Sequence, residues 1–224
     1  MNRRGSPNCD VRPEGIPVDM LVLHYTGMQT AADALARLCD AAAKVSAHYV
    51  IDVDGAVTAL VDEDARAWHA GVSFWRGYTD INARSIGIEL VNPGHEYGYV
   101  DFADAQMAAL IDLAKGIIKR HPIEARNVVG HSDVAPRRKQ DPGERFDWRR
   151  LAEAGIGLWP ERAAPAERFD DTTVAALLAA YGYEMKDMPA AVTAFQRHFR
   201  PDCCDGAADA ETAGLLEALL RRVA

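Results

Sequence analysis

Short apolar runs alternate with helical patterns over the first 160 residues, and this alternation limits the folds that the chain can adopt. Runs rich in Val, Ile and Leu predict buried strands at residues 20–24, 48–53, 85–91 and 127–130. Asp54-Gly55 is a tight-turn signal, so residues 56–61 should pair with the preceding run as a hairpin.

Between these runs, the spacing of apolar residues predicts helices over residues 31–43 and 103–120. Thr30 is a suitable N-cap for the first helix, and Lys119-Arg120 suit the C-terminal end of the second. Interleaved strands and helices favour an α/β domain with a central mixed β-sheet flanked by helices.

The composition changes after Trp159-Pro160. We therefore expect a first domain over residues 1–160, a polar linker rich in Ala and Pro over 161–168, and a small three-helix domain over 169–224. The three helices are predicted at residues 171–182, 189–199 and 209–222, with Asp171, Asp187 and Asp209 as their caps.

Composition excludes several classes of partner. The net charge of −8 argues against nucleic acid, which is bound by clustered Lys and Arg. No run of about 18 apolar residues is present, so no membrane span is expected. No apolar segment follows the basic pair Arg3-Arg4, which predicts no secretory leader and hence the cytoplasm, with the periplasm as the alternative. The four cysteines should be reduced thiols.

The stretch from Gly130 to Gly143 contains a histidine, two aspartates and a lysine in a segment predicted to be a loop. His24 follows the first apolar run, so His24, His131 and Asp141 could supply the three protein ligands of a catalytic zinc ion. On the residues alone, a histidine such as His24 is more often a packed histidine than a ligand, and His131 could equally form a loop hydrogen bond with Asp133.

A carboxylate, Glu89, lies inside another apolar run and suits a general base for water. Lys139 could stabilise the oxyanion formed when a carbonyl group is attacked. Structural alternatives are an ion pair of Glu89 with Arg84 or Arg126, and a solvated Lys139.

Five motifs, taken together, resemble the type 2 N-acetylmuramoyl-L-alanine amidases, a family that includes phage lysozyme-like amidases and peptidoglycan recognition proteins. The motifs begin at Leu23, Ser46, Ala67, Asn82 and Gly130, the last extending to Gly143. The resemblance implies zinc ligation by His24, His131 and Asp141, and catalysis by Glu89 and Lys139. It also implies hydrolysis of the amide between N-acetylmuramic acid, or its 1,6-anhydro form, and L-alanine of the stem peptide, with peptidoglycan or a muropeptide as the substrate.

Two departures point to a subgroup. Phage-type members have a tyrosine where this chain has Ala47, and often a cysteine ligand where it has Asp141. The chain is similar instead to bacterial AmpD-like and AmiD-like amidases of muropeptide recycling and wall remodelling. The pattern around residues 194–201 and 209–212 looks like a peptidoglycan-binding domain.

Residues predicted to bind substrate are His69, Trp75, Asn82 and Arg84. The rival functions are a non-catalytic muropeptide-binding protein of the same fold and a zinc peptidase that cuts another stem-peptide bond.

Overall fold

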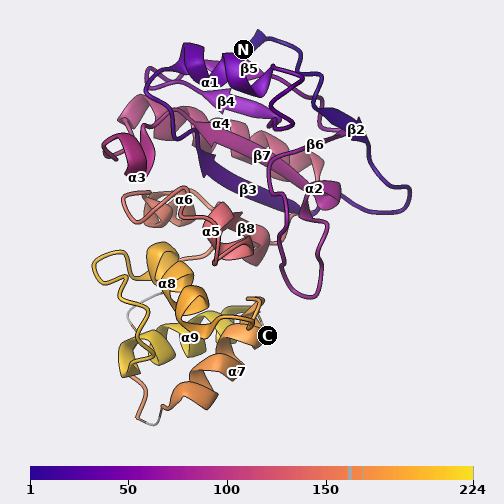
Figure 1. Cartoon of the computed structure of the whole chain (residues 1–224). Coiled ribbons are helices and arrows are strands. Elements are labelled where there is room, and N and C mark those ends of the chain that lie inside the picture. The colour runs from indigo at the N-terminus through magenta and orange to yellow at the C-terminus, as the bar shows by residue number, and fades with distance from the viewer. Residues whose placement is uncertain (161–162, 168, 224) are drawn as a thin grey trace.

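A mixed sheet of six strands forms the centre of the N-terminal part (Figure 1). The computed structural model describes the whole chain except residues 161–162, 168 and 224. The strand order is β1-β5-β4-β7-β3-β8, with bounds Asn2–Arg3, Val57–Ala59, Tyr49–Ile51, Ser85–Leu90, Met20–Tyr25 and Val128–Gly130. Strands β4, β7, β3 and β8 run parallel, and β5 pairs antiparallel with β4. A separate antiparallel pair joins β2 (Cys9–Val11) and β6 (Ala65–Ala67).

The helices fall into two groups. Those between the strands or directly after them are α1 (Ala31–Leu38), α2 (Ile81–Arg84), α3 (Gly94–Tyr97), α4 (Asp104–Arg120), α5 (His131–Val134) and α6 (Trp148–Glu153), with a 3-10 turn at Ala125–Asn127. The C-terminal group consists of α7 (Asp171–Tyr181), α8 (Met188–Phe199) and α9 (Ala210–Val223). None of the helices in the described part of the chain is long and apolar enough to cross a lipid bilayer.

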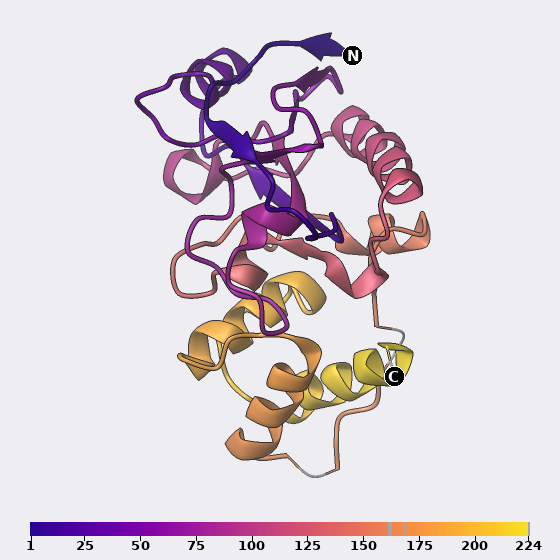
Figure 2. The same ribbon diagram turned by 90° about the vertical axis from the view of Figure 1, so that its right-hand side faces the viewer.

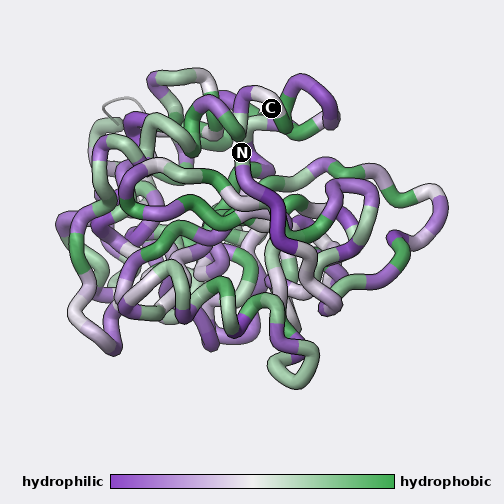
Figure 3. The backbone as a smooth tube through the Cα atoms, turned by 90° about the horizontal axis from the view of Figure 1, so that it is seen from above, coloured by the Kyte–Doolittle hydropathy of each residue, from purple (hydrophilic) through white to green (hydrophobic). Residues whose placement is uncertain are grey.

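The alternation of side chains along a strand divides the sheet into two faces. Leu21 and Leu23 of β3 pack with Ile86 and Ile88 of β7 against α4, on one face. Along the chain, hydrophobic and hydrophilic stretches follow one another closely, as expected for elements with one buried side (Figure 3). The opposite face, which carries the even-numbered residues of β3, is therefore left for other contacts.

Helices α7–α9 lie together beyond β8, α5 and α6 and at the far end of the molecule from the N-terminus (Figures 1 and 2). Their buried side chains share one hydrophobic cluster with the second face of the sheet. The cluster includes Met20, Val22, Val129 and Val134 from the N-terminal part and Leu178, Tyr183, Phe195 and Leu216 from the helices. The core is thus continuous from the sheet into the C-terminal helices.

The predicted α/β class and central mixed sheet are confirmed, as is the hairpin of β4 and β5. The predicted helix 31–43 is wrong at its end and stops at Leu38, because the side chain of Asp40 accepts a hydrogen bond from the Ala42 amide and forms a local turn instead. The stretch predicted to be entirely loop contains the one-turn helix α5.

The three C-terminal helices occur where the apolar spacing predicts them. Asp187 and Asp209 each accept a hydrogen bond from a backbone amide of the first turn, as expected of caps. The cap of α7 is Asp170 rather than Asp171, since Asp170 accepts from the Thr173 amide at 2.7 Å. The predicted linker 161–168 lies partly outside the described residues.

Candidate metal centre

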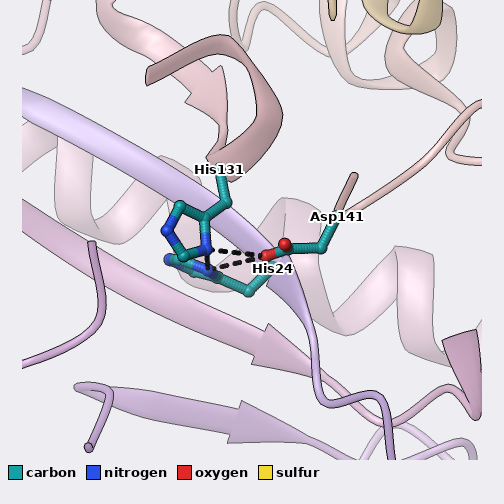
Figure 4. Close-up of side chains that lie close together, drawn as sticks. All are labelled: His24, His131 and Asp141. Carbon is teal, nitrogen blue, oxygen red and sulfur yellow. Dashed lines mark hydrogen bonds and ion pairs between the residues drawn. The ribbon is translucent and has the colours of Figure 1, made fainter. Parts of the chain in front are cut away.

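Three buried side chains with metal-binding atoms converge at one end of the sheet (Figure 4). His24 Nδ1 lies 3.0 Å from His131 Nδ1 and 2.9 Å from Asp141 Oδ2. His131 Nδ1 lies 3.0 Å from the same carboxylate oxygen. The three predicted ligands are therefore brought together in space, although 117 positions separate His24 from Asp141.

Strand register explains this convergence. Leu23 of β3 is opposite Gly130 of the parallel strand β8, so the residues that follow, His24 and His131, leave the sheet side by side. The loop after α5 then returns, and the Ser132 amide donates to the Asp141 carbonyl at 2.9 Å. This backbone contact fixes Asp141 beside the two histidines.

The remaining ring nitrogens are held by hydrogen bonds that set the tautomers. His131 Nε2 lies 3.1 Å from the Ala70 carbonyl, which can only accept, so Nε2 carries the proton. His24 Nε2 lies 3.1 Å from His69 Nδ1, and His69 Nε2 lies 3.1 Å from Ser85 Oγ. Ser85 Oγ donates to the Ile81 carbonyl, so it accepts from His69 Nε2, and His69 Nδ1 in turn accepts from His24 Nε2. His24 Nδ1 therefore has a free lone pair.

The electrostatics fit a cation between the three groups. Burial, and then the neighbouring His131, lower the pKa of His24 to about 4, so its ring is neutral at pH 7. Burial alone would raise the pKa of Asp141, but His131 and His24 hold it well below its usual range. Two imidazole lone pairs and a carboxylate facing one another are the donor set of a catalytic metal site with three protein ligands.

Glu89 lies next to this cluster on β7. It is the cross-strand partner of His24, so the two side chains leave the same face of the sheet, and both line one cavity. Within the described residues Glu89 Oε2 is buried without a hydrogen-bond partner, and burial, followed by the charge of Asp141, raises the pKa of this carboxyl well above its usual range. The ion pairs left open by the sequence are not formed, since Arg84 pairs with Asp19 and Arg126 with Glu124.

The cavity has a volume of about 600 Å³ and brings the predicted catalytic and metal-binding residues together. Lys139, half-buried, lines it beside Asp141. Other lining residues come from strand ends, α1, α3 and the loops; they include Tyr25, Arg37, Trp68, His69, His95 and Arg138. The cavity is therefore open to a ligand much larger than water.

The residues predicted to bind substrate separate into two groups. His69 lines the cavity, but its ring is buried and turned toward His24 and Ser85. Trp75, Asn82 and Arg84 lie outside the cavity lining. Trp75 packs edge-on against Tyr183 of the C-terminal part, and Arg84 pairs with Asp19.

Asn82 supports the wall of the cavity from behind. Its Oδ1 accepts hydrogen bonds from the amides of His69 and Ala70, at 3.1 and 2.8 Å. Ala70 offers its carbonyl to His131, and His69 contacts His24. Asn82 therefore fixes the backbone that orients both histidines of the candidate metal centre.

Sequence reasoning missed other residues of the site. Arg37 and His95 lie on short helices that reach the cavity rim only through tertiary structure, so no local pattern marks them. Ser85 begins β7, and side chains two residues apart on a strand share a face. The spacing from Glu89 could therefore have predicted that Ser85 faces the site.

The alternative contact considered for His131, a hydrogen bond with Asp133, is not formed. The Asp133 carboxylate accepts from the Gly130 amide, from Tyr183 Oη and from His198 Nδ1, and not from the ring of His131. Two of its three hydrogen bonds therefore come from the C-terminal helical part of the chain.

Chemistry of this kind, in which a metal centre, a carboxyl group of raised pKa and a cation share one cavity, is that of the metal-dependent hydrolases. A model of the N-acetylmuramoyl-L-alanine amidase family matches residues 14–144, more than half of the chain. The chain belongs to this family.

Relatives resemble the chain over different lengths. The chain is 41% identical to N-acetylmuramoyl-L-alanine amidase AmiD of Escherichia coli K12, over 92% of this chain and 83% of that protein. It is 35% identical to 1,6-anhydro-N-acetylmuramyl-L-alanine amidase AmpD of Haemophilus influenzae, over 65% of this chain and 86% of that protein. Similarity to AmiD thus reaches into the C-terminal helices.

Solved structures agree. The fold matches AmiD of E. coli in complex with anhydro-N-acetylmuramic acid-L-Ala-D-γ-Glu-L-Lys, with a TM-score of 0.85 and 41% identity over 93% of this chain and 91% of the other. It also matches AmpDh3 of Pseudomonas aeruginosa in complex with an anhydromuramic pentapeptide, with a TM-score of 0.79 and 37% identity over 94% and 95% of the two chains.

Proposed function

We propose that this chain is a zinc-dependent amidase that hydrolyses the bond between N-acetylmuramic acid, or 1,6-anhydro-N-acetylmuramic acid, and L-alanine of a peptidoglycan stem peptide. The observation that carries this proposal is the convergence of His24, His131 and Asp141 beside Glu89, within one cavity of a chain that belongs to the amidase family. Zinc is the metal that suits two imidazoles and one carboxylate with an open position.

His24 and His131 would hold the metal through Nδ1, and Asp141 through Oδ2. Bound zinc lowers the pKa of a coordinated water towards about 7 and polarises a carbonyl group. The protein supplies the rest of the chemistry, because an amide nitrogen must be protonated before it can leave as an amine.

Glu89 takes a proton from the attacking water as oxygen adds to the amide carbonyl carbon. The same carboxyl then gives that proton to the nitrogen of L-alanine as the carbon–nitrogen bond breaks. Burial raises the pKa of Glu89, and a carboxyl group poised nearer to neutral pH serves both as acceptor and as donor. Lys139 stabilises the negative charge on the carbonyl oxygen during the addition.

The substrate is proposed to be a muropeptide or the wall polymer, by analogy with the ligands in the solved complexes of the relatives. Of the predicted substrate-binding residues, His69 lines the cavity and keeps a proposed role there. Trp75, Asn82 and Arg84 would influence binding through the cavity walls, since they lie behind its lining.

Residues 1–160 are proposed as the catalytic part and residues 169–224 as a part that contacts peptidoglycan. Support comes from the extents of similarity: the AmpD relatives match 65% of the chain, whereas AmiD matches 92%. We propose the cytoplasm as the compartment and the periplasm as the alternative. The four free thiols support this proposal, because the cytoplasm keeps thiols reduced. Cell fractionation tests this assignment.

A digest followed by mass spectrometry tests the reaction. The substrates are a soluble anhydro-muropeptide and purified sacculi, each with and without a zinc chelator. We expect release of stem peptides that begin with L-alanine, and loss of this release with the chelator. Cleavage at another peptide bond would indicate a zinc peptidase, and no cleavage by zinc-loaded protein would indicate a muropeptide-binding protein.

A further inference from the structure

A buried carboxylate joins the C-terminal helices to the loop that carries two of the three metal ligands. Asp133 has 0% exposure and lies in α5, two residues after His131. A buried charge of this kind is costly unless hydrogen bonds replace its water. Asp133 has three: Gly130 N and His198 Nδ1 donate to Oδ2, both at 2.7 Å, and Tyr183 Oη donates to Oδ1 at 2.6 Å.

The bond to the Gly130 amide acts on the backbone directly before His131. Gly130 allows no side chain there, because a Cβ atom would lie 2.7 Å from Pro142 Cδ and 3.3 Å from Trp148 Cζ2. The carboxylate of Asp133 and the segment that follows Asp141 thus both lie against this turn. Its position determines where His131 Nδ1 lies.

The two other donors come from the helical part. Tyr183 follows α7 and His198 lies in α8, and both are buried. The ring of His198 stacks on Trp148 of α6, with ring centroids 3.7 Å apart and planes at 19°. Its second nitrogen, Nε2, is buried without a hydrogen-bond partner within the described residues, so the ring is held by Asp133 and by stacking alone.

We propose that Asp133 is a positioning residue for the metal ligand His131, and that Tyr183 and His198 complete this support from the C-terminal helices. Removal of either donor would leave the carboxylate short of a hydrogen bond and free to turn away from the Gly130 amide. The helical part would then be a structural component of the metal centre, in addition to any contact with the wall. This inference rests on the proposed metal site for its zinc measurement and on the proposed reaction for its activity measurement, whereas hydrogen exchange depends on neither.

The experiment compares Tyr183→Phe with a matched control, Tyr181→Phe. Both tyrosines are buried in the same hydrophobic cluster, and only Tyr183 donates to Asp133. Three quantities are measured: amide hydrogen exchange of residues 130–133 in the metal-free protein, zinc affinity by competition with a chelator, and kcat and KM on a soluble muropeptide. Asp133→Asn is measured in parallel. If Asp133→Asn does not fold, the comparison of Tyr183→Phe with Tyr181→Phe decides the test.

We expect Tyr183→Phe to speed exchange of the Gly130 amide and to weaken zinc binding about 10-fold, the lower end of the effect of losing an outer hydrogen-bond partner of a metal ligand. At zinc concentrations that saturate the site, KM should stay unchanged. Tyr181→Phe should leave exchange at Gly130 and zinc affinity within about twofold of the native values.

Equal behaviour of the two variants in exchange and zinc affinity would overturn the inference. The outcome separates it from the proposed function, because exchange and zinc affinity are measured without turnover. A native protein that cleaves muropeptides while both variants bind zinc normally would refute only the role of Asp133. A native protein without amidase activity, in which Tyr183→Phe alone loses zinc affinity, would refute only the proposed reaction.

Discussion

The ring of His69 lies directly over Gly87, so closely that a Cβ atom on residue 87 would come 2.5 Å from His69 Cγ. His69 Nδ1 in turn contacts the Nε2 atom of His24, a proposed metal ligand. The absence of a side chain at one position of β7 therefore makes room for the residue that orients a ligand on β3. Glycine at position 87 is required by this contact.

Gly87→Ala should consequently displace His69 and weaken zinc binding by about 10- to 100-fold, the range found when an outer partner of a ligand is lost. Overpacking should also lower the free energy of unfolding by about 1–3 kcal/mol. Gly116→Ala in α4 is the control, because the nearest atom to its Cβ is the flexible end of Arg120. It should stabilise the protein by about 0.5–1 kcal/mol and leave zinc affinity unchanged. Equal zinc affinity in both variants would contradict the role of His69.

Glu89→Gln should retain zinc but lower kcat by about 100- to 10,000-fold, the contribution of a positioned general base. The amide has the shape of the carboxyl group and cannot take up the proton of water. Zinc content and kcat are measured together, with Glu153→Gln as a control at an exposed position on α6. Near-native turnover by Glu89→Gln would exclude Glu89 from the mechanism.

Replacing His131 by Ala should remove metal and activity together, since the site then keeps only His24 and Asp141. Zinc should also stabilise the native protein against urea by about 2.7 kcal/mol at a concentration 100 times its dissociation constant. His131→Ala should lose this stabilisation. An unchanged zinc content in the variant would refute the assignment of His131 as a ligand.

The metal-free protein should lose stability as the pH falls from 6.5 towards 4. Burial lowers the pKa of His24 to about 4 and that of His48 to about 3, whereas the unfolded chain binds protons with the ordinary pKa near 6.5. In this window the unfolded state binds more protons, so stability rises with pH, by up to about 1.4 kcal/mol per pH unit for each such histidine. Glu89 is replaced by Gln for this measurement, because its raised pKa acts in the opposite direction over the same pH range. Urea unfolding of the Glu89→Gln protein at pH 5, 6 and 7 then measures the slope, and equal stabilities would show that these rings are not neutral in the fold.

The sequence predicts that His24, His131 and Glu89 gather in one place because their signals are local: each is a histidine or a carboxylate in or beside an apolar run. It also predicts the sheet, since the alternation that buries Leu21 and Leu23 is visible in the chain. The second layer of the site is different. His69 is 45 positions from His24, and Tyr183 is 50 from Asp133, so no spacing rule connects these pairs.

Trp75 is a residue that the sequence assigned to the substrate site and that lies elsewhere in the structure. An aromatic residue near His69 and Asn82 in a glycine-containing loop is typical of a substrate groove. In the structure the Trp75 ring is buried in the core, where it contacts Tyr181 and Tyr183 from a part of the chain more than 100 positions away. A residue whose partners come from a distant segment cannot be assigned from its neighbours alone.

His24 is paired with Glu89 across β3 and β7, so the register of these two strands determines both the core and the candidate site. A slip of one residue between these strands would turn every side chain of the moved strand to the opposite face. Leu21 and Leu23 would then leave α4, and His24 would point into the apolar core. A misregistered molecule would thus lose its core and a proposed metal ligand at the same time. A molecule with this slip would therefore be destabilised and unable to hold a metal in the proposed way, and we expect the folded fraction to equal the fraction that can be loaded with metal.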